Sequence, residues 1–263
     1  MRIGLFQFQP VFGDVERNLR QIERGVEGPL DLLVLPELCT SGYQFTAREE
    51  VEAVAEEIPG GKTTARLAAL ARRIGGTVVA GIAERDRGEL YNSAVVVGPE
   101  GYIGKYRKLH LFFEEKDFFA PGNLPLRTFE LAQARIGVMI CFDWIFPEIA
   151  RTLSLQGADI LVLPANLVLP YCQGAMITRA IENRVFTVVA NRIGSEARGG
   201  KAPLRFTGRS QIASPKGEVL VAGPEGRSAF LAVEIGPEEA RNKWITSRNH
   251  LFQDRRPDRY ELC

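Results

Sequence analysis

The feature that most constrains the fold is a short apolar run that occurs twice and ends in proline each time. Residues 31–36 read DLLVLP, and residues 158–164 read ADILVLP. Each run is too short for a helix and is typical of a strand that is buried on both faces. Strands and helices alternate around both runs, while hairpin signals gather in the middle and at the end of the chain. The pattern predicts a mixed α/β sheet system built from two related halves.

The same periodicities predict the remaining elements. We expect a helix capped by Asp14, helices from Thr46, after Gly61, from Pro147 and from Gln173, and strands at 2–8, 77–83, 91–97, 102–106, 136–140, 186–190, 210–213, 218–221 and 228–235. No linker composition interrupts residues 30–235, so residues 1–263 are predicted to form one domain. The tail at 243–263 is basic and aromatic without a clear period. We expect it to wrap the body or to act as an interface arm on a partner subunit.

Composition excludes several classes of function. The chain has 33 Lys and Arg against 32 Asp and Glu, a net charge of +1, so no global field recruits nucleic acid or an anionic membrane. The four cysteines (Cys39, Cys141, Cys172 and Cys263) contain no CxxC pair, and only two histidines are present, so neither a metal site nor a disulfide framework is predicted. No run is long enough to span a membrane, and a cytoplasmic location is expected.

Cys141 stands at the junction of two predicted elements. In residues 135–148 (RIGVMICFDWIFPE) an apolar strand delivers this cysteine to a turn, and Pro147 suits the first turn of a helix. Unpaired backbone N–H groups and the positive end of a helix dipole would favour its thiolate, and the amide of Phe142 would face the charge that develops on an attacked substrate. On this stretch alone, a small buried hydrophobic cysteine is an equally good interpretation.

Two further side chains carry chemistry near predicted strand ends. Glu37 comes directly after the first proline-terminated run, and Lys108 lies in the stretch 105–112 (KYRKLHLF), where an extended chain would place Lys108 and His110 on one face. Hydrolysis of a carbon–nitrogen bond by a cysteine needs a nucleophile, a base and a cation or N–H group for the oxyanion. Cys141, Glu37 and Lys108 would supply these three roles, although a lone Glu or Lys is more often a surface charge.

At these residues the chain resembles the nitrilase superfamily of carbon–nitrogen hydrolases. The similarity rests on residues 35–43 (LPELCTSGY), 104–112 (GKYRKLHLF) and 137–148 (GVMICFDWIFPE), in the order and spacing of that family. Supporting stretches are 91–94, 120–122, 179–184 and 255–258. The resemblance implies a four-layer α-β-β-α sandwich and a homodimer or higher homo-oligomer that pairs through helical faces.

The resemblance also implies roles for individual residues. Glu37 would be the general base, Lys108 the oxyanion-stabilising lysine and Cys141 the nucleophile, with neither a metal nor an organic cofactor required. A further glutamate is expected in the loop at 112–122, which looks too polar for core. Glu115 matches better than Glu114, and either catalysis or a salt bridge to Lys108 would explain it. Lys108 would favour the Cys141 thiolate while the carboxylates oppose it.

The sequence and the resemblance indicate the substrate only in outline. A small-molecule amide or nitrile, or an N-carbamoyl compound, would be attacked by the same sulfur to give a thioester, and a small linear, non-peptide amide is preferred because amide hydrolysis is the commoner activity in such families. Phe142, Tyr43, Trp144 and Asn166 are candidate substrate-binding residues by their position beside the motifs. Two alternatives remain: a Cys-His hydrolase using His110 or His250, and a catalytically silent scaffold or binding protein.

Overall fold

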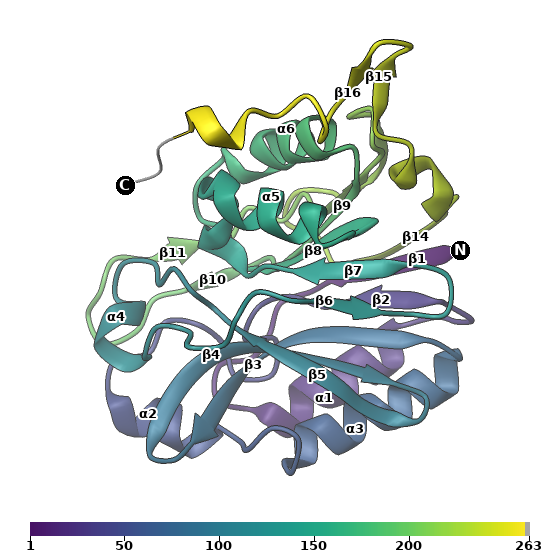
Figure 1. Ribbon diagram of the computed structural model, residues 1–263. Helices are drawn as coiled ribbons and strands as arrows, with labels where there is room; N and C mark the ends of the chain where they lie inside the picture. Colours follow the sequence, from purple (N-terminus) through teal and green to yellow (C-terminus); the bar gives the residue numbers. More distant parts are fainter. Residues whose placement is uncertain (261–263) are drawn as a thin grey trace.

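The computed structural model describes residues 1–260 and has four layers, helix, sheet, sheet and helix (Figure 1). Helices α1 (Val15–Gly25) and α3 (Lys62–Ile74) cover the outer face of the first sheet. Helices α5 (Pro147–Leu155) and α6 (Cys172–Asn183) cover the second sheet. The predicted α-β-β-α sandwich is therefore confirmed. Cys263 and the last residues of the predicted tail lie outside the described residues.

The first sheet has six strands in the order β14-β1-β2-β3-β4-β5. Strands β1, β2 and β3 run parallel, and β14, β4 and β5 pair antiparallel with their neighbours. The strand bounds are β1 (Arg2–Gln7), β2 (Leu32–Val34), β3 (Thr77–Asp86), β4 (Glu89–Gly98), β5 (Gly101–Arg107) and β14 (Ala229–Glu234). Because β5 ends at Arg107, Lys108 and His110 do not share a strand face, contrary to the extended arrangement expected from the sequence.

The second sheet repeats this design in the order β13-β12-β9-β8-β7-β6. Its parallel strands are β7, β8 and β9. The bounds are β6 (Thr128–Glu130), β7 (Arg135–Val138), β8 (Ile160–Ala165), β9 (Phe186–Asn191), β12 (Gln211–Ala213) and β13 (Val219–Ala222). The two proline-terminated runs of the sequence become β2 and β8, and each is the middle strand of a parallel triplet. The prediction of two related halves is thus borne out.

The side chains of β2 show how the layers are joined. Leu32 and Val34 belong to the core cluster that also contains Ile136 and Val138 of the second sheet. Leu33 points to the opposite face and packs in the cluster that contains Leu67 of α3. Alternate residues of one buried strand therefore bind the facing sheet and the outer helix, as the period of a strand requires.

The shorter elements complete the chain. They are α2 (Arg48–Val54), α4 (Glu115–Phe118), the 3-10 turns η1 (Cys141–Ile145), η2 (Pro237–Arg241) and η3 (Pro257–Arg259), and two small hairpins, β10 (Ser195–Glu196) with β11 (Leu204–Arg205) and β15 (Trp244–Thr246) with β16 (Asn249–His250). The β15–β16 hairpin projects from the top of the molecule (Figure 1). Among the described residues, no helix is long and apolar enough to cross a membrane.

Candidate active site

The predicted site residues follow the carboxyl ends of strands from both sheets. Glu37 comes after β2 and the dipeptide Leu35-Pro36, Lys108 follows β5, Cys141 comes shortly after β7, and Asn166 directly follows β8. Ligand sites of open α/β sheets lie at such carboxyl ends, where the chain leaves the ladder and side chains converge.

Lys108 lies between two buried carboxylates. Its Nζ donates to Glu37 Oε1 at 2.6 Å and to the two oxygens of Glu115 at 2.7 and 2.8 Å. The side chains of Lys108 and Glu37 are 0% exposed, and that of Glu115 is 4% exposed. The polar segment 112–122 therefore does not stay outside the core as expected, because its short helix α4 carries Glu115 inward to meet a buried cation. Glu114 instead pairs with Lys201 at 2.9 Å, so Glu115 is the glutamate of this cluster.

The two oxygens of Glu37 have different surroundings. Oε1 accepts from Lys108 and from Asn92 Nδ2, the latter at 2.7 Å. Oε2 is buried and has no hydrogen-bond partner. A buried carboxylate oxygen without a donor is unusual, and such atoms are found at catalytic positions. Glu37 is thus held by one oxygen and free to accept a proton with the other.

Glycine permits the close approach of the chain at Glu37. A Cβ atom at Gly81 of β3 would lie 2.4 Å from the Cα of Glu37, well inside van der Waals contact. Gly122 plays a similar part next to Lys108, since a Cβ there would lie 2.2 Å from the carbonyl oxygen of Arg107. The Gly122 amide also donates to the Lys108 carbonyl at 2.8 Å. These two glycines allow backbone segments to pack against the residues that carry the charges.

Cys141 begins the η1 turn in a left-handed conformation with φ of 42°. Such a backbone is strained for a residue other than glycine, and strain of this kind concentrates at functional sites. Asp143, which is fully buried, fixes the turn. Its Oδ2 accepts from the Ile140 amide at 2.9 Å and from the Tyr106 hydroxyl at 2.7 Å. Sequence reasoning did not identify Asp143, whose partner Tyr106 lies in β5 of the other sheet.

The electrostatic surroundings of Cys141 differ from the expectation. Burial raises the pKa of the Cys141 thiol well above its ordinary value, Glu37 and Glu115 raise it further, and Lys108 and the Asn166 backbone N–H only partly oppose them. The balance favours the thiol, which differs from the thiolate expected from the strand end and the helix dipole, whereas the expected opposition between Lys108 and the carboxylates is present. Cys141 does not lie at the start of α5 either, because η1 separates it from Pro147.

The charged neighbours of Cys141 also have shifted pKa values. Burial alone would lower the pKa of Lys108, but the charges of Glu115 and Glu37 outweigh it and raise that pKa above its ordinary range. Burial raises the pKa of Glu115 to about 6, against the opposing effect of Lys108. Lys108 is thus a permanent cation, while Glu115 titrates close to neutral pH.

A small hollow opens at Cys141. Four of the predicted residues line it, namely Cys141, Phe142, Trp144 and Asn166, together with Phe112, Leu167, Val168 and Leu169. The side chain of Asn166 is buried, and neither its oxygen nor its nitrogen has a partner. Tyr43 lines a neighbouring hollow and donates its hydroxyl to Glu115 Oε1 at 2.6 Å. The predicted residues are therefore brought together, but the Tyr43 hydroxyl is already engaged by a protein group.

The two histidines have other partners. His110 Nδ1 lies 2.9 Å from Asp143 Oδ1, and its ring stacks on Phe146 with centroids 3.5 Å apart. His250 lies in β16, where its ring meets Trp244 edge to face. No hydrogen bond joins either histidine to Cys141 in the described part of the chain. Within residues 1–260 there is also no group of three or more His, Cys, Asp or Glu placed to hold a metal ion.

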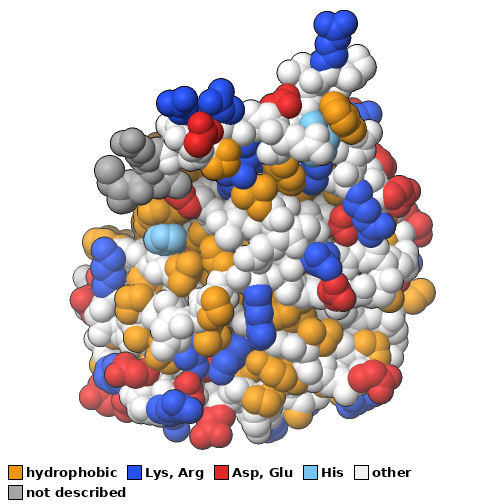
Figure 2. Space-filling view, in the orientation of Figure 1, with side chains coloured by type: hydrophobic (Ala, Val, Ile, Leu, Met, Phe, Trp, Pro, Cys, Tyr) orange, Lys and Arg blue, Asp and Glu red, His pale blue; other side chains and the backbone are white. Residues whose placement is uncertain are grey.

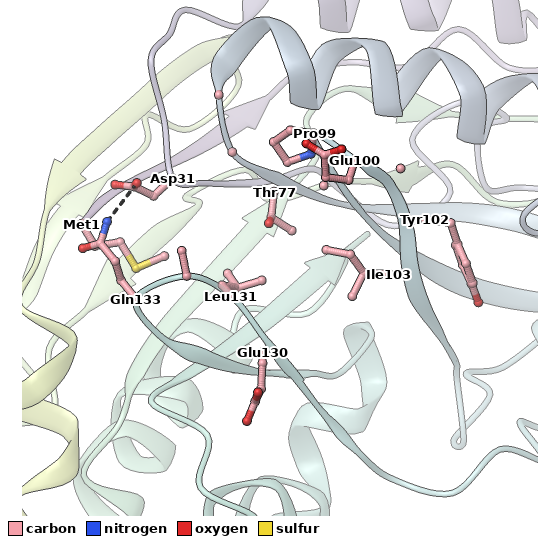
Figure 3. A pocket seen from close by; sticks show the side chains of 15 residues that line it. Met1, Asp31, Thr77, Pro99, Glu100, Tyr102, Ile103, Glu130, Leu131 and Gln133 are labelled. Carbon is pink, nitrogen blue, oxygen red and sulfur yellow. Dashed lines mark hydrogen bonds between the residues drawn. The ribbon is translucent and has the colours of Figure 1, made fainter.

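A larger pocket, of about 380 Å³, lies at the opposite edge of the sandwich (Figure 3). Its lining includes Asp31 and Thr77, at the beginnings of β2 and β3, and the turn between β6 and β7. Gln133 of that turn donates to Asp31 at 3.2 Å. None of the predicted site residues lines this pocket, so the candidate site is the smaller hollow at Cys141.

Comparison with known proteins decides the family. A family model described as carbon-nitrogen hydrolase matches residues 2–243. The chain belongs to the carbon-nitrogen hydrolase family. It is therefore an enzyme of the nitrilase superfamily, which confirms the resemblance inferred from the three motifs.

Relatives within this carbon-nitrogen hydrolase family have several activities in their names. A nitrilase from Pyrococcus abyssi is 49% identical over 99% of each chain. An N-carbamoylputrescine amidase from Solanum lycopersicum is 31% identical over 95% of this chain and 90% of its own. Among solved structures, a glutamate-to-glutamine mutant of the amidase from Nesterenkonia sp. AN1 has a TM-score of 0.76 and 26% identity, covering 92% of this chain and 96% of its own. That structure shows acrylamide added to the active-site cysteine.

Proposed function

We propose that this carbon-nitrogen hydrolase cleaves the C–N bond of a small linear amide through a thioester on Cys141. The observation that carries the proposal is a buried carboxylate, Glu37, whose Oε1 pairs with the buried cation Lys108 and whose Oε2 has no partner, near a cysteine with a strained backbone. These are the base, the charge and the nucleophile that acyl transfer to sulfur requires.

The first step follows from the high pKa of the thiol. Because burial and the nearby carboxylates favour the thiol form of Cys141, the sulfur loses its proton as it attacks, and Glu37 Oε2 is the proposed acceptor. A C–S bond forms while the carbonyl electron pair moves onto oxygen. The ammonium of Lys108, which stays charged, and the backbone N–H of Phe142 stabilise that oxyanion.

The later steps return the proton. Collapse of the tetrahedral species breaks the C–N bond, and Glu37 gives its proton to the leaving nitrogen, which departs as ammonia or an amine. Water then attacks the thioester, Glu37 accepts a proton from it, and that proton finally returns to the sulfur. Acid and regenerated enzyme are the products, and the cycle consumes only water.

In this reaction we assign Glu115 the role of positioning Lys108. Its two oxygens both accept from the ammonium, and Tyr43 donates to one of them. We therefore assign Tyr43 to the orientation of Glu115 instead of to direct contact with substrate. Tyr43 is itself held by Glu196, whose Oε2 accepts from the Tyr43 amide at 3.1 Å.

Asn166 supports an amide as the substrate. Its buried carboxamide offers an unpaired acceptor and unpaired donors beside Cys141. A substrate amide has a carbonyl and an N–H group and could satisfy both, whereas a nitrile has no donor. Leaving a buried polar group unpaired costs about 1–3 kcal/mol, which favours the amide. An N-carbamoyl compound satisfies the same pair.

Nitrile hydrolysis to an acid and ammonia is the second candidate. It is favoured by one specific observation, the 49% identity to the Pyrococcus abyssi protein named as a nitrilase. The same attack by Cys141 would give a thioimidate. One water would add to it and ammonia would leave to form the thioester, which a second water would hydrolyse to the acid. A catalytically silent scaffold of the same fold is the alternative that an assay excludes most directly.

The test is an ammonia-release assay on short amides, N-carbamoyl amino acids and aliphatic nitriles, with wild-type protein, Cys141→Ala and Glu37→Gln. We expect turnover of amides by the wild type only, with a loss of at least about 10²–10⁴-fold in kcat for Glu37→Gln. Turnover of nitriles alone would select the second candidate. No release from any compound, or full activity of Cys141→Ala, would overturn the assignment.

The quaternary structure and the setting belong to this proposal too. We propose that residues 243–260 form an interface arm of a homodimer or higher oligomer, because the projecting hairpin exposes Trp244 and Ile245, at 48% and 53%. Sedimentation at monomer mass would contradict the arm.

The free, buried thiols of Cys39, Cys141 and Cys172 support a reducing, cytoplasmic setting.

A further inference from the structure

Two small hollows lie side by side at the active site and share a wall. The Cys141 hollow is lined by Phe112, Cys141, Phe142, Trp144, Asn166, Leu167, Val168 and Leu169. The second hollow, which we call the Glu115 hollow, is lined by Tyr43, Gln44, Phe45, Phe112, Phe113, Glu114, Glu115, Phe118, Phe119, Val168 and Leu204. Phe112 and Val168 occur in both linings. These two side chains therefore separate the nucleophile from the space beyond it.

Each hollow is narrow. Each has room of about 20 Å³, which is little more than one water molecule needs. An acyl group on Cys141 that extends towards the Glu115 hollow would have to cross the position of Phe112 or Val168. The shared wall is thus placed to limit the length of the acyl group.

The wall is held in place by several contacts. The Phe112 ring lies 5.1 Å from that of Phe142, and the Phe112 amide donates to Glu115 Oε2 at 3.3 Å. The next residue, Phe113, has a strained φ of 48°. The backbone at Phe112 is therefore held by the same carboxylate that holds Lys108, and its ring packs against Phe142.

The Cys141 hollow also lacks charge. Its lining contains no Asp, Glu, Lys or Arg among the described residues, and Asn166 is its uncharged polar group. In the Glu115 hollow both carboxylates already have cations, Glu114 through Lys201 and Glu115 through Lys108. Hydrophobic side chains also gather on the surface above α4 (Figure 2). A charged substrate arm would therefore be desolvated without a counter-ion, which is strongly unfavourable.

We propose that the Cys141 hollow selects short, uncharged acyl groups and that Phe112 and Val168 set the length limit. This inference rests on the proposed function, because it concerns the substrate of the same cysteine. It separates the enzyme's substrates from amides that carry an ammonium or a carboxylate at the far end of the chain.

The first test is a series of amides. For wild-type enzyme we expect kcat/KM to fall at least tenfold from butyramide to hexanamide, since one methylene in such a pocket changes rates about 10–200-fold. Succinamate and 4-aminobutyramide should react at least a hundredfold more slowly than pentanamide. Phe112→Ala should raise the hexanamide-to-butyramide ratio at least tenfold, and Tyr102→Ala, an aromatic truncation at the opposite edge, should leave it unchanged. Val168→Ala serves as a second wall variant if Phe112→Ala does not fold.

The second test does not depend on turnover. Cys141 is alkylated with iodoacetamide, iodoacetate or N-hexyl iodoacetamide, the adduct is located by mass spectrometry, and each rate is divided by the rate with glutathione. After normalisation, wild-type protein should react at least tenfold faster with iodoacetamide than with either other reagent. The Phe112→Ala variant should react faster with N-hexyl iodoacetamide than the wild type does. Equal normalised rates for the three reagents, or a hexyl rate unaffected by both wall variants, would overturn the inference even in an active amidase. Selective alkylation without hydrolysis of any amide or nitrile would instead refute the proposed function alone.

Discussion

Replacing Gly81 by alanine should damage catalysis without touching a charged residue. The new Cβ would lie 2.4 Å from the Cα of Glu37 and 2.7 Å from the Leu38 amide nitrogen. Carbon atoms pack at about 3.5–4.0 Å, so the backbone of Glu37 must move by roughly 1 Å to relieve the contact. Such a displacement carries Glu37 Oε2 away from the cysteine.

The size of the effect can be estimated for activity and for stability. A misplacement of about 1 Å can lower the rate about 10²-fold, and overpacking of a core costs roughly 1–3 kcal/mol. For a chain of this length that corresponds to a fall in Tm of roughly 2–12 °C. We therefore expect Gly81→Ala to lose about two orders of magnitude in kcat/KM while it still folds.

The assay compares kcat/KM and Tm for the wild type, Gly81→Ala and Gly174→Ala. Gly174 lies in α6, and a Cβ there would meet nothing within 4 Å. Alanine in a helix is favoured over glycine by up to about 1 kcal/mol, so this control should keep full activity and a Tm at or above that of the wild type. A folded Gly81→Ala protein with activity within twofold of wild type would refute the reasoning about Glu37.

Two further predictions concern the charges. Lys108→Met removes the counter-ion of two buried carboxylates, so it should abolish turnover and lower the free energy of unfolding in urea by about 3–5 kcal/mol. The control Lys116→Met, at an exposed position of α4, should change neither turnover nor stability. A Lys108→Met protein as stable as the wild type would contradict the ion cluster. Because the pKa of Glu115 is raised to about 6, its carboxylate form is present above that pH and is lost as the pH falls through it. We expect kcat/KM to decline below about pH 6 in the wild type and this acidic limb to disappear or move in Glu115→Gln; an unchanged limb would assign it to another group.

The strands and the charged residues at their ends could be predicted from the sequence because their signals are local. Apolar runs stopped by proline located β2 and β8, and the same runs placed Glu37 beyond a strand end. The local sequence also drew attention to Lys108 and Cys141, and the resemblance added Glu115. The structure joins Glu37, Lys108 and Glu115 in one buried ion cluster, and Cys141 lies close enough to feel their charges. The contacts that hold these residues were harder to predict. Asn92 and Asp143 act across long separations in the chain, and nothing in their immediate neighbours indicates the partner.

Two expectations failed for a common physical reason. The thiolate of Cys141 looked favoured from its place after a strand, and the segment around Glu115 looked too polar for the core. Both depend on burial, which a one-dimensional pattern does not measure. Cys141 is only 5% exposed and lies near two carboxylates that oppose its ionisation, whereas Glu115 can be buried because Lys108 and Tyr43 satisfy it.

The proposed reacting groups come from opposite halves of the sandwich. Glu37 and Lys108 follow strands of one sheet, and Cys141 follows a strand of the other. If these residues act as proposed, neither half turns over a substrate by itself, and activity that returns during refolding would report the docking of the two halves.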